Sequence, residues 1–182
     1  MIKYLALLRG INVGGNKLIK MADLRELFAS AGFKNVRTYI QSGNVIFETR
    51  VSDTDEIARK LEKAIHQSLG HEVTVIVQTV AAVRESVKAN PFKSIESEED
   101  VVRFVTFMSA EPPKTLRLPF VIAKENAEVL AIRNRAAFLA CRRKLNGIFG
   151  FPNAVFEKDL AVAATTRTLG TVTKLLSLAE EN

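Results

Sequence analysis

The sequence predicts an α+β fold built from two β-α-β-β-α-β units that pack together, with antiparallel sheets and helices on one face. Three observations support this fold class. An uninterrupted apolar run over residues 4–8 is typical of a central strand buried on both faces. Apolar residues at helical spacing then alternate with short β-type runs as far as Val77. After Asn90 a looser version of the same order follows.

The first half contains the elements of one complete unit. In chain order, the expected elements are a strand over 4–8, a helix over 21–31, a strand over 36–40, a strand over 45–47, a helix ending at Leu69 and a strand over 73–77. Gly32 and Gly70 end the two helices, and Ser52 with Asp55 resembles a capping box that opens the second one. A turn over 41–44 joins the middle strands. This order is that of the ferredoxin-like split unit.

The second half predicts a looser ferredoxin-like unit and an extra C-terminal helix. The expected elements are a helix over 80–89, a strand over 101–108, a helical turn at Pro112 and Pro113, a hairpin of 128–132 with 136–141, a helix over 152–160, a strand over 161–165 and a terminal helix over 171–178. We place the boundary near Asn90, which gives domains over 1–90 and 91–182. The connection over 80–89 does not have the composition of a flexible linker, so we expect close packing of the units.

Composition restricts the function classes. The net charge of +6 and the isoelectric point near 9.6 favour acidic or phosphorylated partners. No apolar run approaches the ~18 residues of a membrane span, and residues 1–8 are too short for a signal peptide, so we expect no membrane association. A single cysteine, Cys141, fits a reducing cytoplasm. His66 and His71 with one cysteine form no zinc-type ligand set, and we expect neither a metal nor a cofactor.

The loop after the first strand is the most informative segment. Over residues 9–17 it holds three glycines and two asparagines, which permit positive φ and close approach of the backbone to a ligand. Arg9, Lys17 and Lys20 add positive charge where loop amides are available to an anion. The alternative is that Gly10, Gly14 and Gly15 only permit a tight connection, because neither the dinucleotide nor the P-loop glycine spacing is present.

The expected topology brings this loop to the turn over 41–44. A right-handed crossover makes the first two strands parallel, so both connections emerge at one edge, and His71 follows the second helix there. The resulting cluster has many donors and no carboxylate, which suits an anion better than a metal. The candidate ligand-binding residues are Arg9, Gly10, Asn12, Gly14, Gly15, Lys17, Gln41, Ser42, Asn44 and, from the second half, Arg167.

Several motifs resemble a bacterial family known as domain of unknown function 1697. They are Leu7-Leu8-Arg9-Gly10-Ile11-Asn12-Val13-Gly14-Gly15, Lys20-Met21-Ala22-Asp23-Leu24-Arg25, Arg37-Thr38-Tyr39-Ile40-Gln41-Ser42-Gly43-Asn44-Val45 and, further on, Gly150-Phe151-Pro152-Asn153, Glu157-Lys158 and Ala164-Thr165-Thr166-Arg167. The family pattern continues Arg-Asn-Trp after the paired threonines, whereas this chain has Arg167-Thr168-Leu169. The resemblance implies a two-part ferredoxin-like architecture and a cytoplasmic setting, and it implies no activity, cofactor or catalytic residue.

Three hypotheses for function follow, and the sequence leaves open whether there is catalysis. The leading one is a protein that binds a phosphate-bearing ligand, a nucleotide or nucleic-acid backbone, at the opening loop. The second is a small cofactor-independent enzyme for a phosphorylated metabolite, with Lys17 or His71 transferring a proton and Arg9 holding the phosphate. The third is a protein-interaction scaffold. The oligomeric state is not predicted.

Other features have two interpretations each. The basic run Arg133, Arg135, Arg142, Arg143 and Lys144 is either a solvated hairpin face or a nucleic-acid contact. Cys141 is an inert core thiol unless it is exposed beside the arginines. The threonines around Arg167 either cap the last helix or contact a ligand.

Overall fold

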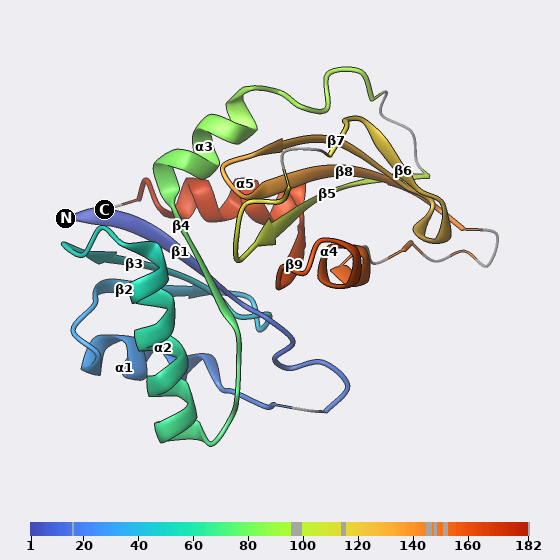
Figure 1. Cartoon of the computed structure of the whole chain (residues 1–182). Helices are drawn as coiled ribbons and strands as arrows, with labels where there is room; N and C mark the ends of the chain where they lie inside the picture. The colour runs from blue at the N-terminus through green and yellow to red at the C-terminus, as the bar shows by residue number, and fades with distance from the viewer. Residues whose placement is uncertain are drawn as a thin grey trace. The chain divides into compact units, whose positions relative to one another are not determined.

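The computed structural model describes residues 1–15, 17–95, 100–113, 116–144, 147, 149–150 and 153–181. Within them the protein is a mixed α+β chain with two antiparallel sheets and five α-helices (Figure 1). It divides into two compact units, Met1–Ala82 with Leu175–Asn182, and Val83–Lys174. This division falls inside helix α3 (Val80–Lys88), ahead of the boundary expected near Asn90, and the C-terminal residues belong to the first unit.

The first unit holds one four-stranded sheet and the two helices that follow β1 and β3. Its elements are β1 (Ile2–Leu8), α1 (Met21–Ser30), β2 (Lys34–Tyr39), β3 (Asn44–Thr49), α2 (Thr54–Leu69) and β4 (Val75–Thr79). The strand order is β2-β3-β1-β4, and every neighbouring pair is antiparallel. β1 is therefore an inner strand, as its continuous apolar run predicts.

The core of the first unit lies between one face of this sheet and helices α1 and α2. Phe47 is at its centre, with ring centroids 5.6 Å from Tyr4, 5.5 Å from Phe28 and 4.8 Å from Phe33. Such aromatic pairs contribute about 0.5–1.5 kcal/mol each beyond their burial. Leu5 alternates to the opposite face and is also fully buried. The aromatic cluster therefore fixes the helices on the sheet and holds β1 in register.

Three local expectations for this unit were wrong by a few residues. Asp53, and not Ser52, caps α2, because its carboxylate accepts hydrogen bonds from the backbone N–H groups of Asp55 and Glu56 at 2.8 and 3.1 Å. Ile40 lies in the turn after β2 with a left-handed φ of +49°. β4 begins at Val75 and runs to Thr79, which shifts it toward α3.

The second unit holds a five-stranded sheet. Its elements are β5 (Val101–Met108), β6 (Phe120–Ile122), a 3-10 turn (Ala123–Glu125), β7 (Ala127–Arg133), β8 (Ala136–Arg142), α4 (Asn153–Asp159), β9 (Ala164–Thr168) and α5 (Leu169–Leu178), which ends in the first unit. The strand order is β6-β7-β8-β5-β9. The expected β7-β8 hairpin is present, and Asn134 and Arg135 form its turn with left-handed φ values of +49° and +57°.

The order of the second unit departs from the expectation on both sides of this hairpin. β6 and the 3-10 turn lie in the connection between β5 and β7, and the helical turn expected from Pro112 and Pro113 extends into residues outside the described ones. The last strand is Ala164–Thr168 and not 161–165, because the β-branched threonines pair with β5. Helix α4 starts at Asn153, and the expected start at Pro152 lies outside the described residues.

Candidate functional site

Asn12 joins the opening loop to the turn between β2 and β3. Its side-chain amide donates to the backbone carbonyls of Ile19 at 3.0 Å and Gln41 at 2.8 Å, and its Oδ1 accepts from the Ile19 N–H at 2.8 Å. Next to it, the Leu8 N–H donates to the Gly43 carbonyl at 2.8 Å. The structure thus brings together the two segments that the topology predicts to be neighbours.

Left-handed backbone gives the opening loop its shape. Gly10, Gly14 and Gly15 have φ values of +66°, +60° and +78°, and Asn12 and Lys17 have +55° and +47°. The Asn12 N–H donates to the Lys17 carbonyl at 3.2 Å, so the loop closes on itself. The glycines therefore do what the sequence predicts, since they supply conformations that other residues rarely adopt.

Lys17 extends to the segment before β4. Its Nζ donates to the Glu72 carbonyl at 2.5 Å, and it lines a cavity of about 480 Å³. The other residues lining that cavity are Glu62, Lys63, His66, Glu72, Val73 and Thr74. This corrects the expectation of a carboxylate-free site, because two glutamates lie beside the lysine. It also places His66, rather than His71, in the same cavity, and α2 presents that residue one turn after Glu62.

The turn residues Ser42 and Asn44 hold the hairpin together. Asn44 is fully buried, and its amide donates to the Tyr39 carbonyl at 3.1 Å and to Ser42 Oγ at 2.9 Å. A Cβ on Gly43 would lie 2.7 Å from Leu8 Cβ and 2.8 Å from Ile11 Cδ1. Asn44 and Gly43 are thus structural here, and the exposed members of the turn are Ile40 and Gln41.

Three exposed apolar side chains near Asn12 were not among the residues predicted for the site. Val13 is 68% exposed, Leu18 is 69% exposed and Ile40 is 49% exposed. Each is next in sequence to a member of the hydrogen-bonded set Asn12, Ile19 and Gln41, so the three belong to one edge of the unit. Their exposure could have been predicted from the sequence, because apolar residues inside a glycine-rich loop have no helix or strand to bury them.

Arg167 belongs to the second unit, whereas every other candidate ligand-binding residue belongs to the first. It lies on β9, and its Nη1 donates to Thr165 Oγ1 at 2.7 Å and to the Thr166 carbonyl at 2.9 Å. Burial lowers the pKa of Arg167 to about 10, which still leaves the guanidinium charged at neutral pH. The candidate residues therefore form no single constellation within one unit.

The threonines around Arg167 have two separate structural roles. Thr166 is buried, donates to Asn153 Oδ1 and shares a 2.7 Å hydrogen bond with Thr106. Thr168 Oγ1 instead accepts from the Thr171 N–H at 3.2 Å at the start of α5. The helix-cap interpretation thus holds for Thr168, while Thr166 joins α4 to the sheet.

Cys141 is fully buried in the second core, as the apolar strand pattern predicts. Burial, aided by the nearby Glu125 carboxylate and opposed by Lys144, raises the pKa of this thiol to about 12. Since the thiolate is the nucleophile, Cys141 is unsuited to nucleophilic chemistry.

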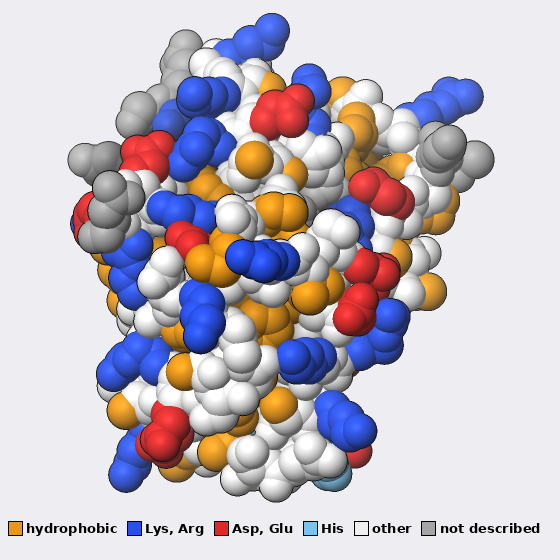
Figure 2. Space-filling model, turned by 90° about the vertical axis from the view of Figure 1, so that its left-hand side faces the viewer, with side chains coloured by type: hydrophobic (Ala, Val, Ile, Leu, Met, Phe, Trp, Pro, Cys, Tyr) orange, Lys and Arg blue, Asp and Glu red, His pale blue; other side chains and the backbone are white. Residues whose placement is uncertain are grey.

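Lysine and arginine side chains are dispersed over the surface. On the face drawn in Figure 2 they are scattered among hydrophobic, acidic and uncharged groups and do not form one continuous block. The charge pattern on this face therefore favours local contacts with an anion over one extended basic surface.

Among the described residues, no helix has the length and apolar character needed to cross a bilayer.

Comparison with known proteins identifies a family and a fold. Residues 1–138 match the family described as "Protein of unknown function (DUF1697)", which confirms the family resemblance. The solved structure of the conserved bacterial protein SP0830 from Streptococcus pneumoniae is similar, with a TM-score of 0.68 and 20% sequence identity, over 98% of this chain and 99% of that chain. At this identity the likeness shows the fold alone. No curated protein matches the chain.

Proposed function

Because the chain belongs to the DUF1697 family of unknown function, we propose its function from its own residues: it binds a phosphate-bearing ligand, a nucleotide or nucleic-acid backbone, at the opening loop. The observation that carries this proposal is the edge formed by the loop and the turn, which Asn12 ties together. The β2-β3-β1-β4 order supports a ferredoxin-like assignment for the first unit, and the lone thiol Cys141 supports a cytoplasmic setting.

The loop and turn that form this edge carry both exposed cations and exposed apolar side chains. Lys17 and Lys20 are exposed, and the Lys17 ammonium, with three donors, uses one on the Glu72 carbonyl. Val13 and Leu18 of the same loop and Ile40 of the turn are exposed as well. A nucleotide or a single strand of nucleic acid presents the same combination, with charged phosphates beside planar, largely apolar bases.

The contact is proposed for the exposed edge and not for the interior of the cavity that Lys17 also lines. Glu62 and Glu72 line that cavity, and a phosphate there would meet like charge. Glu62 is held in place because its Oε1 accepts from the Val75 N–H at 2.9 Å. The ligand therefore approaches from solvent, where Arg9 and Lys17 supply charge-assisted hydrogen bonds.

The test compares two double variants that remove the same charge from the first unit. Arg9→Gln with Lys17→Gln changes the proposed edge, and Lys34→Gln with Arg50→Gln changes exposed cations at the far ends of β2 and β3. Fluorescence anisotropy with a labelled oligothymidylate and thermal shifts with ATP report binding. The edge variant is expected to raise the Kd about ten-fold or more, and the control less than about two-fold. Equal effects of the two, or no binding by the wild type, contradict the proposal.

A second candidate function, a cofactor-independent enzyme for a phosphorylated metabolite, is favoured by one separate observation. Lys17 and His66 line the same cavity and are both suited to proton transfer, while the phosphate would be held at the exposed edge by Arg9 and not beside the two glutamates. Release of inorganic phosphate or turnover of phosphate esters, lost in His66→Gln and retained in His71→Gln, would support this alternative. Absence of both binding and turnover would leave the scaffold hypothesis.

A further inference from the structure

The second unit contains a cavity that the opening-loop proposal does not use. Its volume is about 580 Å³, within the range of small-molecule sites. It lies between the segment over 89–95, which follows α3, and the part of the sheet formed by β7 and β8. The side chains that define its chemistry are Lys93, Glu128, Leu130, Arg133 and Arg142.

Strand alternation directs Arg142 to this cavity and away from the second core. Cys141, directly before it on β8, is buried in the core that contains Phe156 of α4. Phe138 and Arg142 lie on the opposite face, and the Phe138 ring contacts Phe92 of the covering segment at 5.8 Å. Arg142 is thus on the face that the segment over 89–95 covers.

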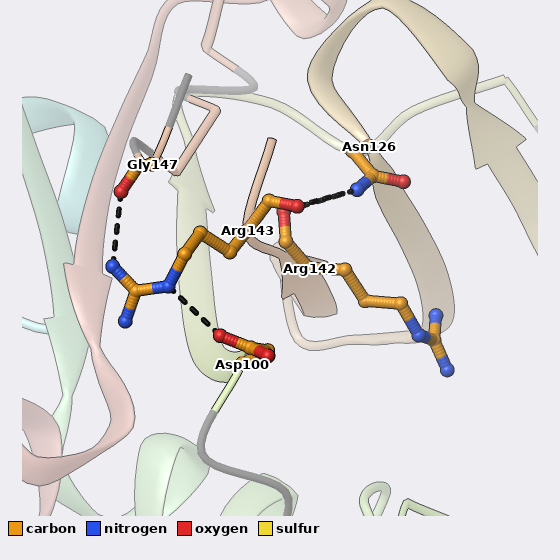
Figure 3. Close-up of polar contacts among 5 residues, drawn as sticks. All are labelled: Asp100, Asn126, Arg142, Arg143 and Gly147. Carbon is orange, nitrogen blue, oxygen red and sulfur yellow. Dashed lines mark hydrogen bonds and ion pairs between the residues drawn. The ribbon is translucent and has the colours of Figure 1, made fainter. Parts of the chain in front are cut away.

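The neighbouring Arg143 is held by structural contacts, which distinguishes it from Arg142. Figure 3 shows the two guanidinium groups pointing in opposite directions. Arg143 Nε donates to Asp100 Oδ1 at 2.9 Å and Nη1 donates to the Gly147 carbonyl at 2.9 Å, while Asn126 Nδ2 donates to the Arg143 carbonyl at 3.1 Å. The basic run noted in the sequence therefore divides into a structural arginine and one directed at a cavity.

Within the described residues, the side chains of Lys93, Arg133 and Arg142 take part in no ion pair and no hydrogen bond. Arg135 is occupied by contrast, since its Nη1 donates to the Ser109 carbonyl at 2.9 Å. Three cations with one carboxylate, Glu128, give the described cavity lining a net positive charge. An anionic ligand would meet donors that are not already committed.

The covering wall of the cavity is fixed by its own contacts. Phe92 is buried against the sheet, and the Arg103 guanidinium lies 6.0 Å from its ring centroid. Arg103 Nη2 also donates to the Ile95 carbonyl at 3.0 Å, and the Lys93 N–H donates to the Asn90 carbonyl at 3.1 Å. The segment that carries Lys93 is therefore held in position before a ligand arrives. Less conformational entropy of this segment is then lost when the ligand binds.

We propose that this cavity binds a phosphate monoester whose organic part carries hydroxyl groups, a sugar phosphate or a mononucleotide. Arg133 lies beside the hairpin turn and Arg142 at the other end of β8, and each presents a planar guanidinium fork that matches phosphate oxygens. The Glu128 carboxylate accepts hydrogen bonds from ligand hydroxyls, and Leu130 contacts the apolar face of a sugar or base. Since no residue of the opening loop lines this cavity, the proposal stands independently of the one above.

The test is calorimetric titration of the full-length protein with glucose 6-phosphate, AMP, glucose and inorganic phosphate. Arg133→Gln with Arg142→Gln is compared with Arg117→Gln with Lys124→Gln, which removes the same charge at exposed positions outside the cavity. We expect one ester to bind at least ten-fold more tightly than phosphate or glucose. The cavity variant is expected to weaken that ester about ten-fold or more, and the control less than about two-fold. Whichever ester binds distinguishes the sugar phosphate from the nucleotide.

Two further measurements make the outcome decisive. Glu128→Gln is expected to weaken the ester while leaving the weaker affinity for inorganic phosphate unchanged. Saturation of the opening loop with oligothymidylate is expected to leave binding of the ester to this cavity intact, which separates the two sites. Failure of both esters to bind, binding no tighter than that of inorganic phosphate, or equal loss in the cavity and control variants would overturn the proposal.

Discussion

Asn12 Nδ2 donates a hydrogen bond of 2.8 Å to the backbone carbonyl of Gln41, across a sequence separation of 29 residues. With the two bonds between Asn12 and Ile19, it makes one side chain responsible for the geometry of two connections. The proposed ligand-binding edge exists only while that side chain holds the loop against the turn.

Asn12→Ala is therefore expected to destabilise the protein more than a matched change elsewhere. It removes three hydrogen bonds and leaves partly buried backbone groups without a partner, a loss of roughly 2–3 kcal/mol in the free energy of unfolding. Asn35→Ala is the control, because Asn35 also has a left-handed φ, of +51°, and makes one exposed bond to Glu48. We expect it to cost about 1 kcal/mol or less. Urea denaturation checks both, and equal losses would mean that Asn12 does not hold the edge together.

Much of the first unit could be predicted because its signals are local. The apolar run of β1, the helical stripes and the glycine stops are all read from short windows, and together they give the observed order through β4. The partner of Lys17 was not predictable in this way. Its bond to the Glu72 carbonyl depends on where the segment before β4 passes, which is a tertiary relationship.

The second unit was less predictable because its signals conflict. The threonines over 165–168 suit both a strand and a helix cap, and pairing with β5 decides in favour of the strand. The strand β6, which pairs with β7, was not predicted, and the helical turn expected from Pro112 and Pro113 extends into residues outside the described ones. The direction of Arg142 follows from strand alternation in β8 and requires the register of that strand to be known, whereas Arg143 lies beyond the end of β8 and is held by Asp100.

Gly43→Ala is expected to be much more damaging than Gly14→Ala. Both glycines have left-handed φ, +72° and +60°, so both substitutions carry about 1 kcal/mol of backbone strain. Only at Gly43 does the added Cβ also meet other atoms, at 2.7 Å from Leu8 Cβ. Overpacking there adds roughly 1–3 kcal/mol. Thermal and urea unfolding of the two variants measure the difference. Equal free energies of unfolding would show that the turn adjusts to the added Cβ with no loss of stability.

Gln78→Met is expected to stabilise the protein. Gln78 is 3% exposed on β4, and no described residue accepts a hydrogen bond from its Nε2. A buried donor left without a partner costs about 1–3 kcal/mol, and methionine has a similar shape without the amide. Gln67→Met, at an exposed position of α2, is the control and should change the free energy of unfolding by less than about 0.5 kcal/mol. A loss of stability in Gln78→Met would show that the amide has a partner that the methionine cannot replace.

Cys141 should resist alkylation in the folded protein and make stability depend on pH in the alkaline range. Burial raises its pKa to about 12, whereas an unfolded thiol titrates near 8.5. The unfolded chain therefore loses its proton first, and folding stability contributed by the neutral thiol is lost progressively as the pH rises above that value. By about pH 10 the wild type should lose roughly 1–2 kcal/mol relative to its own stability at pH 7, beyond any loss in Cys141→Ala. Iodoacetamide labelling at about pH 8, slow in the native protein and complete in urea, checks the burial. Rapid native labelling together with parallel pH profiles of the two proteins would show that the thiol is accessible and titrates normally.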